Sequence, residues 1–197
     1  MSTWISKASP LGFGVILSLS ACVAMESGPS GARSATIMNG EIRVPAPSGY
    51  CVDRAASQAT EMAAVIIMGR CSDTASVPPA AITATIGAAG SAAVLTAGTQ
   101  ALADYFATAD GRAALSRSGQ ASAVTVHEIG SADGAVVLHL TDRAVGEYWR
   151  AVLGLRGRLV TLAVTPPDGQ PLSVAEGRAL LLRAISGLRA ANADNAT

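Results

Sequence analysis

Short runs rich in β-branched residues follow one another along the chain, and Gly, Pro and Ser residues separate them. Such runs, bounded by turn-forming residues, are typical of β-strands. Two of them, 123–129 (AVTVHEI) and 135–140 (AVVLHL), flank the turn-like sequence GSADG, which favours a β-hairpin. We expect the buried face of this hairpin to carry Val124, Val126, Val136, Leu138 and Leu140. The other predicted strands are 41–44 (EIRV), 49–53 (GYCVD), 63–68 (AAVIIM), 81–86 (AITATI) and 158–165 (RLVTLAVT).

Apolar residues at helical spacing predict helices elsewhere. The segment TQALADYFATA begins at Thr99, and we expect Asp110 and Gly111 to end it before a second short helix in RAALSRSG. The last helix has the clearest signals. Ser173 followed by Glu176 fits a capping box, and one face then repeats Leu181, Ile185 and Leu188 to about residue 192.

Together these elements predict an α+β fold. We expect a mostly antiparallel sheet of about six or seven strands, one or two central helices, and a C-terminal helix packed on the sheet. Residues 40–192 are predicted to form this single domain, and residues 193–197 a frayed tail. Residues 22–39, rich in small and polar residues, are predicted to be a flexible tether.

The first residues carry an export signal. Lys7 supplies positive charge, and the apolar core at 11–19 has only nine residues. A membrane-spanning helix needs roughly 20 residues, so this core is too short to be one. Residues 19–22 (LSAC) resemble the lipobox of bacterial lipoproteins. That resemblance implies removal of residues 1–21 as a signal peptide and attachment of acyl chains (palmitate-type lipid) to Cys22. The alternative is a plain signal peptide cut near Ala24.

The lipoprotein resemblance also implies a location. The protein would be held in the cell envelope by its lipid, facing the periplasm, and its membrane contact would be the lipid anchor. Val23 follows the cysteine where an aspartate favours the inner membrane in the best understood lipoproteins, so the outer membrane is expected. The chain has 14 Lys or Arg and 14 Asp or Glu. That balance gives no reason to expect nucleic acid as a partner.

An exported chain folds where thiols pair, so Cys51 and Cys71 are predicted to form a disulfide. The two residues lie 20 positions apart. A reactive thiol or a metal site is the alternative. A metal site would need further ligands nearby, and the chain has no Cys-x-x-Cys motif.

Several chemistries are excluded. Lys7 is the only lysine, so the processed chain can hold neither a Walker A phosphate loop nor a Schiff base. No Gly-x-Ser-x-Gly motif is present, and the glycines of ITATIGAAGSAA do not match a dinucleotide fingerprint. We therefore predict no catalytic set, no resident metal and no cofactor.

Two small groups of residues are candidate contacts. If the hairpin turns near Ala132, His127 and His139 project from the face opposite the valines as diagonal neighbours. They could share a ligand or proton, or be two polar residues on the less buried side. In the segment EYWRAVL, Tyr148 and Trp149 stand close to helical spacing with Val152 and Leu153. We expect Trp149 to be a core anchor, the alternative being a binding patch with Tyr148.

Five stretches resemble a group of uncharacterised lipoproteins from Gram-negative, GC-rich bacteria. They are GYCVDRAAS, GRC, GRAALSRSG, YWRAVLGLRGRLVTLAV and LLRAISGLRAAN. The order of strands and helices also resembles, more distantly, that of PsbP and Mog1-like proteins, which implies a fold but no function. Two functions remain. The first is a non-catalytic binding module that contacts an envelope protein, and the second a small-ligand binder or enzyme with a non-standard site near His127 and His139.

Overall fold

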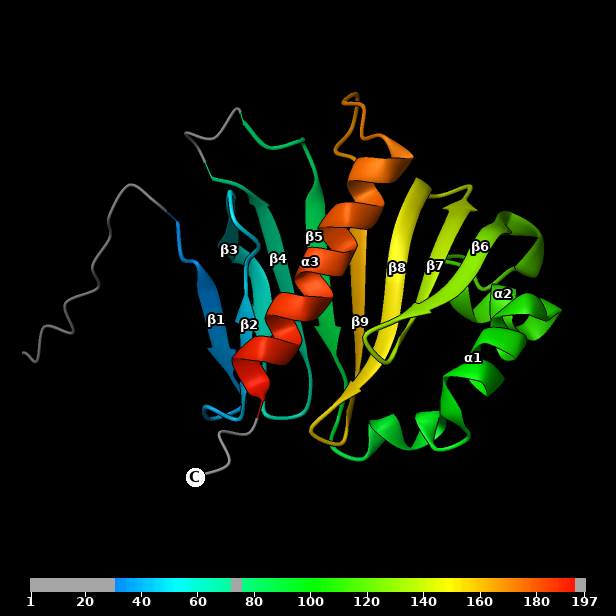
Figure 1. Ribbon diagram of the computed structural model, residues 1–197, viewed down its shortest axis with the longest axis horizontal. Coiled ribbons are helices and arrows are strands. Elements are labelled where there is room, and N and C mark those ends of the chain that lie inside the picture. The colour runs from blue at the N-terminus through cyan, green and yellow to red at the C-terminus, as the bar shows by residue number, and fades with distance from the viewer. Residues whose placement is uncertain (1–30, 72–75, 194–197) are drawn as a thin grey trace, which may run out of the picture.

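A seven-stranded antiparallel sheet forms the centre of the molecule, and its strands lie in the order β3-β4-β5-β9-β8-β7-β6 (Figure 1). The computed structural model describes residues 31–71 and 76–193. The predicted α+β class is confirmed. The strands are β3 (Tyr50–Ala59), β4 (Ala64–Arg70), β5 (Ala81–Ile86), β6 (Val124–Ala132), β7 (Ala135–Asp142), β8 (Gly146–Leu155) and β9 (Arg158–Thr165).

The helix α3 (Val174–Asn192) crosses one face of this sheet diagonally (Figure 1). The predicted capping box is present: Ser173 Oγ accepts from the Glu176 backbone N–H, and the Glu176 carboxylate accepts from the Ser173 backbone. The predicted apolar stripe is buried in the larger core, together with the inward residues of β4, β5, β8 and β9. Within residues 31–71 and 76–193, no helix combines the length and apolar composition needed to cross a bilayer.

A second, two-stranded sheet joins β1 (Ser34–Ile37) to β2 (Ile42–Pro45). Ile37, Ile42 and Val44 add their side chains to the larger core. The end of α3 is fixed to β2 because Asn192 accepts from the Arg43 N–H and donates to the Arg43 carbonyl. The strand β1 lies inside the range 22–39 assigned from the sequence to a tether, so the folded part of the chain begins before residue 40.

The opposite face of β6, β7 and β8 is covered by α1 (Gly98–Ala107) and α2 (Ala109–Leu115). Short 3₁₀ helices, η1 (Ser91–Leu95) and η2 (Ala121–Ala123), lie in the connections. The predicted break at Asp110 and Gly111 is wrong: Thr108 ends α1 and caps α2 by accepting from the Gly111 N–H. A Cβ at Gly111 would stand 1.9 Å from the Tyr105 carbonyl oxygen. Glycine therefore permits the close approach of the two helices.

The segment around Trp149 is a strand, β8, and the helical spacing expected there is wrong. β8 lies between β7 and β9 with α3 over one face and α1 and α2 over the other. A strand that is buried on both faces is apolar at nearly every position, so its pattern no longer separates strand from helix.

The predicted hairpin of β6 and β7 is present, but its turn lies at Asp133 and Gly134 and not near Ala132, which pairs with Ala135. Asp133 and Gly134 have φ angles of 53° and 69°, the left-handed values that a two-residue hairpin turn requires. The residues predicted for its buried face lie in a second, smaller hydrophobic core between the sheet and the helices α1 and α2. Val126 is partly buried at its margin. The register shifts between Val126 and Glu128, so His127 occupies a β-bulge.

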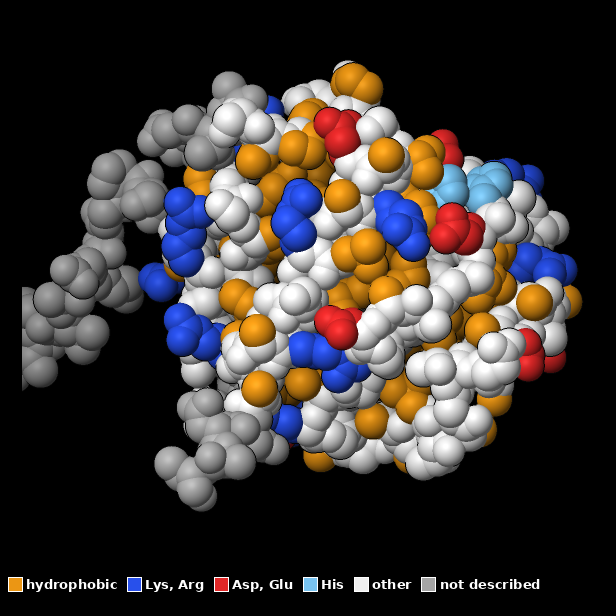
Figure 2. Space-filling view, in the orientation of Figure 1, with side chains coloured by type: hydrophobic (Ala, Val, Ile, Leu, Met, Phe, Trp, Pro, Cys, Tyr) orange, Lys and Arg blue, Asp and Glu red, His pale blue; other side chains and the backbone are white. Residues whose placement is uncertain are grey.

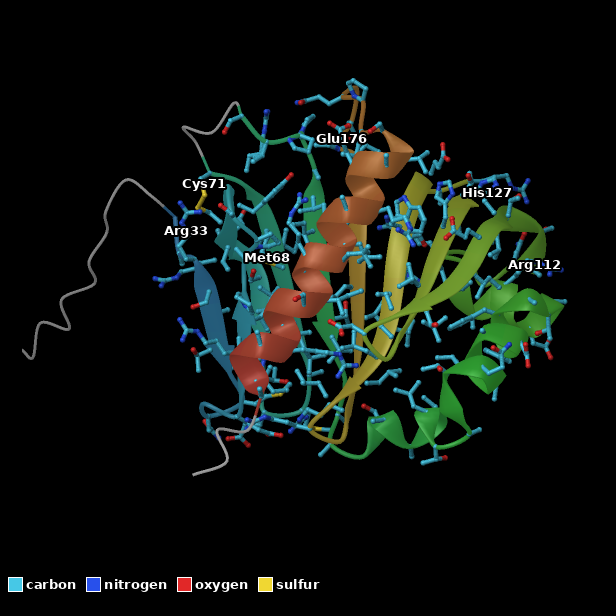
Figure 3. The ribbon with its side chains drawn as sticks, in the orientation of Figure 1. Arg33, Met68, Cys71, Arg112, His127 and Glu176 are labelled. Carbon is cyan, nitrogen blue, oxygen red and sulfur yellow. A yellow bond between two sulfur atoms is a disulfide. The ribbon has the colours of Figure 1, made fainter. Side chains whose placement is uncertain are left out.

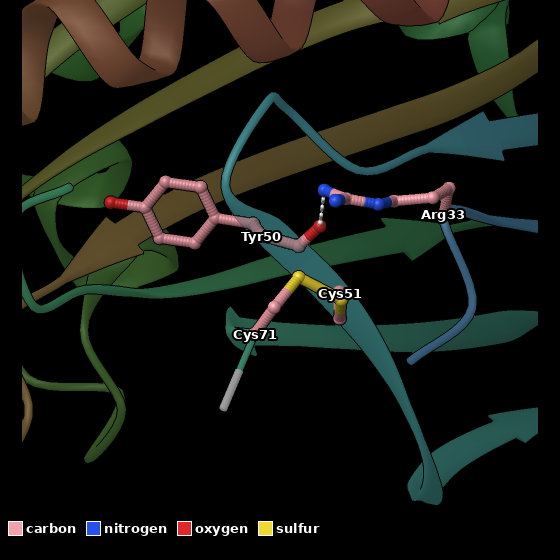
Figure 4. Close-up of a disulfide and its surroundings, with 4 residues drawn as sticks. All are labelled: Arg33, Tyr50, Cys51 and Cys71. Atoms are coloured by element: carbon pink, nitrogen blue, oxygen red, sulfur yellow. Dashed lines mark hydrogen bonds between the residues drawn. A yellow bond between two sulfur atoms is a disulfide. The ribbon is translucent and has the colours of Figure 1, made fainter. Parts of the chain in front are cut away.

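Cys51 and Cys71 form a disulfide, with Cα atoms 5.1 Å apart (Figure 4). The bond joins the start of β3 to the residue that follows β4. Arg33 donates to the Tyr50 carbonyl beside it. Cys22, the predicted site of lipid attachment, lies outside the described residues, as do 194–197 of the predicted tail.

Asp142 ties α2 to the turn between β7 and β8. Its side chain is fully buried, and its carboxylate accepts from the Arg117 N–H at 2.7 Å and the Ala144 N–H at 2.8 Å. Burial alone would raise the pKa of this carboxyl, but the two backbone hydrogen bonds and the positive charge of Arg150 outweigh it, so the pKa is lowered.

Candidate functional site

Three aromatic rings from neighbouring strands lie side by side on the face that α3 crosses; we call this group the aromatic stack, in which His139 is stacked on Trp149 and tilted by 43° to His127. The His127 and His139 ring centroids are 5.0 Å apart, and those of His139 and Trp149 are 4.6 Å apart with nearly parallel planes. His139 stands opposite Trp149 in the register of β7 and β8. The bulge in β6 turns His127 onto the same face. Two candidates from the sequence, His127 and His139, are thus brought together with Trp149.

Trp149 is a core residue, as predicted: only 2% of its surface is exposed. Its indole N–H donates to the Val174 carbonyl at 2.9 Å, which joins β8 to the first turn of α3. A Cβ on Gly177 would approach the indole Cδ1 to 2.9 Å, so glycine lets the helix lie against the ring. The guanidinium of Arg178 lies 5.9 Å from the ring centroid.

His139 is 9% exposed, and its Nε2 lies 2.8 Å from Glu147 Oε1. The contact is not aligned as a hydrogen bond, and no other described residue bonds this buried nitrogen. A proton on Nε2 is required to make the contact attractive, because two lone pairs at this separation would repel. The Glu147 carboxylate thus lies close to His139 Nε2, at an angle that does not make a hydrogen bond.

His127 is exposed on the edge strand, where its Nε2 lies 2.8 Å from Thr141 Oγ1 (Figure 3). The two imidazoles thus have different oxygen partners. In the described part of the chain, no group of three or more His, Cys, Asp or Glu side chains is arranged to hold a metal ion.

Tyr148 does not share this face with Trp149. Successive side chains of a strand point to opposite sides of the sheet, and Tyr148 is buried in the second core beneath α1 and α2. Burial raises the pKa of its hydroxyl, although the guanidinium of Arg150, 5.4 Å from the ring, opposes the shift. The alternative of a joint surface patch of Tyr148 and Trp149 is wrong.

A pocket of about 250 Å³ opens beside the stack, between β8 and the start of α3. Figure 2 shows this face, with the histidines in pale blue and acidic side chains next to them. The apolar lining is contributed by Trp149, Val164, Pro166, Pro171, Leu172 and Val174, and the polar lining by His139, Glu147, Gln170 and Ser173.

Ser173, His139 and Glu147 line the same pocket, yet they do not form a nucleophilic triad. In such a triad, histidine takes the proton of the serine hydroxyl. Here the hydroxyl of Ser173 lies 2.6 Å from Glu176 Oε2 and accepts from the Glu176 N–H (Figure 3). The hydrogen bonds from Ser173 lower the pKa of the Glu176 carboxyl, so the capping box keeps this hydroxyl occupied.

Glu147, Gln170 and Gly177 also belong to this site, and none of the sequence patterns pointed to them. A usable signal existed for Glu147, which stands two residues before Trp149. Once the segment is assigned to a strand, Glu147 and Trp149 must lie on one face. Gln170 and Gly177 join the site only through the folding of the 166–173 loop and α3 against β8, which no local pattern indicates.

Comparison of the chain with protein-family models, curated proteins and solved structures finds no match. The resemblances to a lipoprotein group and to PsbP and Mog1-like proteins therefore stay predictions. The function has to be inferred from the geometry of the site.

Proposed function

We propose that this chain is a non-catalytic binding protein, anchored by lipid in the bacterial cell envelope and facing the periplasm. The pocket beside Trp149 is its binding site. The observation that carries the binding role is that His139, a residue of the pocket lining, has a buried Nε2 without an aligned hydrogen bond among the described residues. Buried polar atoms are nearly always bonded, and an exception often marks a functional position.

The walls of the pocket suit binding better than turnover. Apolar side chains with a few polar groups are typical of small-molecule sites. Ser173 is held by its capping box and His139 by Glu147 and the aromatic stack. Rigid side chains of this kind orient a ligand but leave no free nucleophile beside a base.

Native mass spectrometry of the protein released gently from its own envelope tests the binding role. We expect an additional mass from a bound small molecule, and we expect its chemical structure to stay unchanged on incubation with the protein. Val174→Trp is the control, because Val174 lines the pocket yet is exposed at the start of α3. The larger side chain should exclude the ligand without lowering the melting temperature. A wild-type protein that carries no ligand would contradict the binding role, and a converted ligand would contradict the non-catalytic role.

The anchor has its own test. The sequence LSAC after the short apolar core predicts acylation of Cys22, so labelled fatty acid should enter the wild-type protein and should not enter Cys22→Ser. A Cys51→Ser, Cys71→Ser double variant is the matched control and should keep the label. Persistent labelling of Cys22→Ser would refute the lipid attachment.

A further inference from the structure

We infer that the pocket beside Trp149 selects a small amine, meaning an apolar body that carries a protonated amino group. The inference rests on the proposed binding function and names the class of its ligand. It depends on the size of the pocket, on the placement of Glu147, and on the way nearby positive charges are already used.

The size of the pocket limits the ligand. Pockets for drug-sized molecules usually measure about 300–1,000 Å³, and this one is smaller, at about 250 Å³. Its floor and sides are the indole of Trp149 together with valine, proline and leucine side chains. The faces of the indole are already occupied by His139 and approached by Arg178. The ligand therefore meets the ring at its edge, which suits a compact aliphatic or aromatic body.

Glu147 fixes the charge of the ligand. Its Oε1 lies 2.8 Å from His139 Nε2, and a carboxylate has a second oxygen with further lone pairs. The side chain is 54% exposed, so that oxygen remains accessible from the pocket. Among the described residues, His139 is the ion-pair partner of Glu147, and an imidazole offsets the negative charge only when it carries two protons.

The arginine nearest the stack does not neutralise Glu147. Arg178 lies 3.8 Å from Glu128 and over the indole. A second carboxylate, Glu176, stands at the pocket margin through its bond to Ser173. A cationic ligand therefore gains attraction from both acids, whereas an anionic ligand meets repulsion, and no arginine stands among the described residues that line the pocket.

Three probes with one phenyl ring and different head groups test this ligand class: 2-phenylethylammonium, 2-phenylethanol and phenylacetate. Their affinities are measured by calorimetry at low salt for the wild type, Glu147→Gln and Glu61→Gln. Glu61 is an exposed acid between β3 and β4, distant from the pocket in the strand order. We expect the ammonium to bind about fivefold more tightly than the alcohol, as a partly exposed ion pair allows, and phenylacetate to bind most weakly.

The preference for the ammonium should disappear in Glu147→Gln, remain in Glu61→Gln, and shrink as salt rises. Equal affinities for the three probes in the wild type, or a preference that survives in Glu147→Gln, would overturn the assignment of an amine. The binding function would then stand, since the probes still occupy the pocket. If the ammonium probe does not bind below about 10 mM, the assignment of an amine ligand is also overturned. The binding function is then decided separately, by whether mass spectrometry finds a native ligand.

Discussion

Replacing Trp149 with alanine is expected to lower the free energy of unfolding by about 3–5 kcal/mol, equivalent to a fall of roughly 10 °C in melting temperature for a domain of this size. The change leaves a cavity between β8 and α3 and removes the donor to the Val174 carbonyl. It also removes the ring on which His139 stacks. Thermal and urea unfolding followed by circular dichroism measure the loss.

Trp149→Phe separates packing from hydrogen bonding. Phenylalanine fills much of the space but cannot donate to Val174, so we expect a smaller loss, about 1–2 kcal/mol. In the chain processed as proposed, without residues 1–21, Trp149 would be the only tryptophan. Its emission should therefore be blue-shifted and poorly quenched by iodide. Red-shifted, easily quenched emission with unchanged melting in Trp149→Ala would contradict the anchor role.

Replacing Asp142 with asparagine should cost about 2–4 kcal/mol at neutral pH. The carboxylate accepts from two backbone N–H groups, those of Arg117 and Ala144. The amide of asparagine keeps one acceptor but turns its own NH₂ toward the second donor, so one buried N–H loses its bond. Urea unfolding at pH 7 measures the loss, and Asp133→Asn, in the exposed hairpin turn, is the control that should change little.

The carboxyl of Asp142 also makes the stability of the folded protein depend on pH. Its pKa is lower in the folded protein than in the unfolded chain, where an aspartate has a pKa of about 3.9. The contribution of this carboxyl to the free energy of unfolding is therefore complete above the unfolded pKa, and it is lost as pH falls through the lower pKa of the folded protein. The stability gap between wild type and Asp142→Asn should narrow below about pH 4. A gap that stays constant to pH 2 would contradict this assignment.

Local patterns predicted most of the fold, because most strands here are bounded by glycine or proline. The capping box of α3 was readable since both residues stand in one turn. The strand β8 was not predicted, because burial on both faces removes the alternation of apolar and polar residues on which strand assignment depends. β1 was also missed, as its four residues become a strand only by pairing with β2 and burying Ile37.

The candidate site could be predicted only in part, because most of its contacts join segments that are distant in the sequence. The contact of His127 with His139 was predicted from a turn near Ala132, whereas it depends on the bulge in β6, because the register that the actual turn sets pairs His139 with Glu128. The stack continues to Trp149 only because β8 pairs with β7, a contact that depends on the strand assignment of 146–155. The pocket needs a further long-range event, the docking of α3 on β8, and its residues carry no signal of their own.

The disulfide described at the start of β3 would have a mechanical consequence in a protein held, as proposed, by a lipid at Cys22. Gly31 lies against Cys51, where a Cβ would be 2.8 Å from that of the cysteine, and Ala32 bridges to Val52. In the protein anchored as proposed, tension from Cys22 would reach the domain at the edge strand, where the disulfide links β3 to the residue after β4. The disulfide would resist a force that separates β3 from β4. The pocket beside β8 lies away from this force, because β4, β5 and β9 stand between β3 and β8 in the sheet.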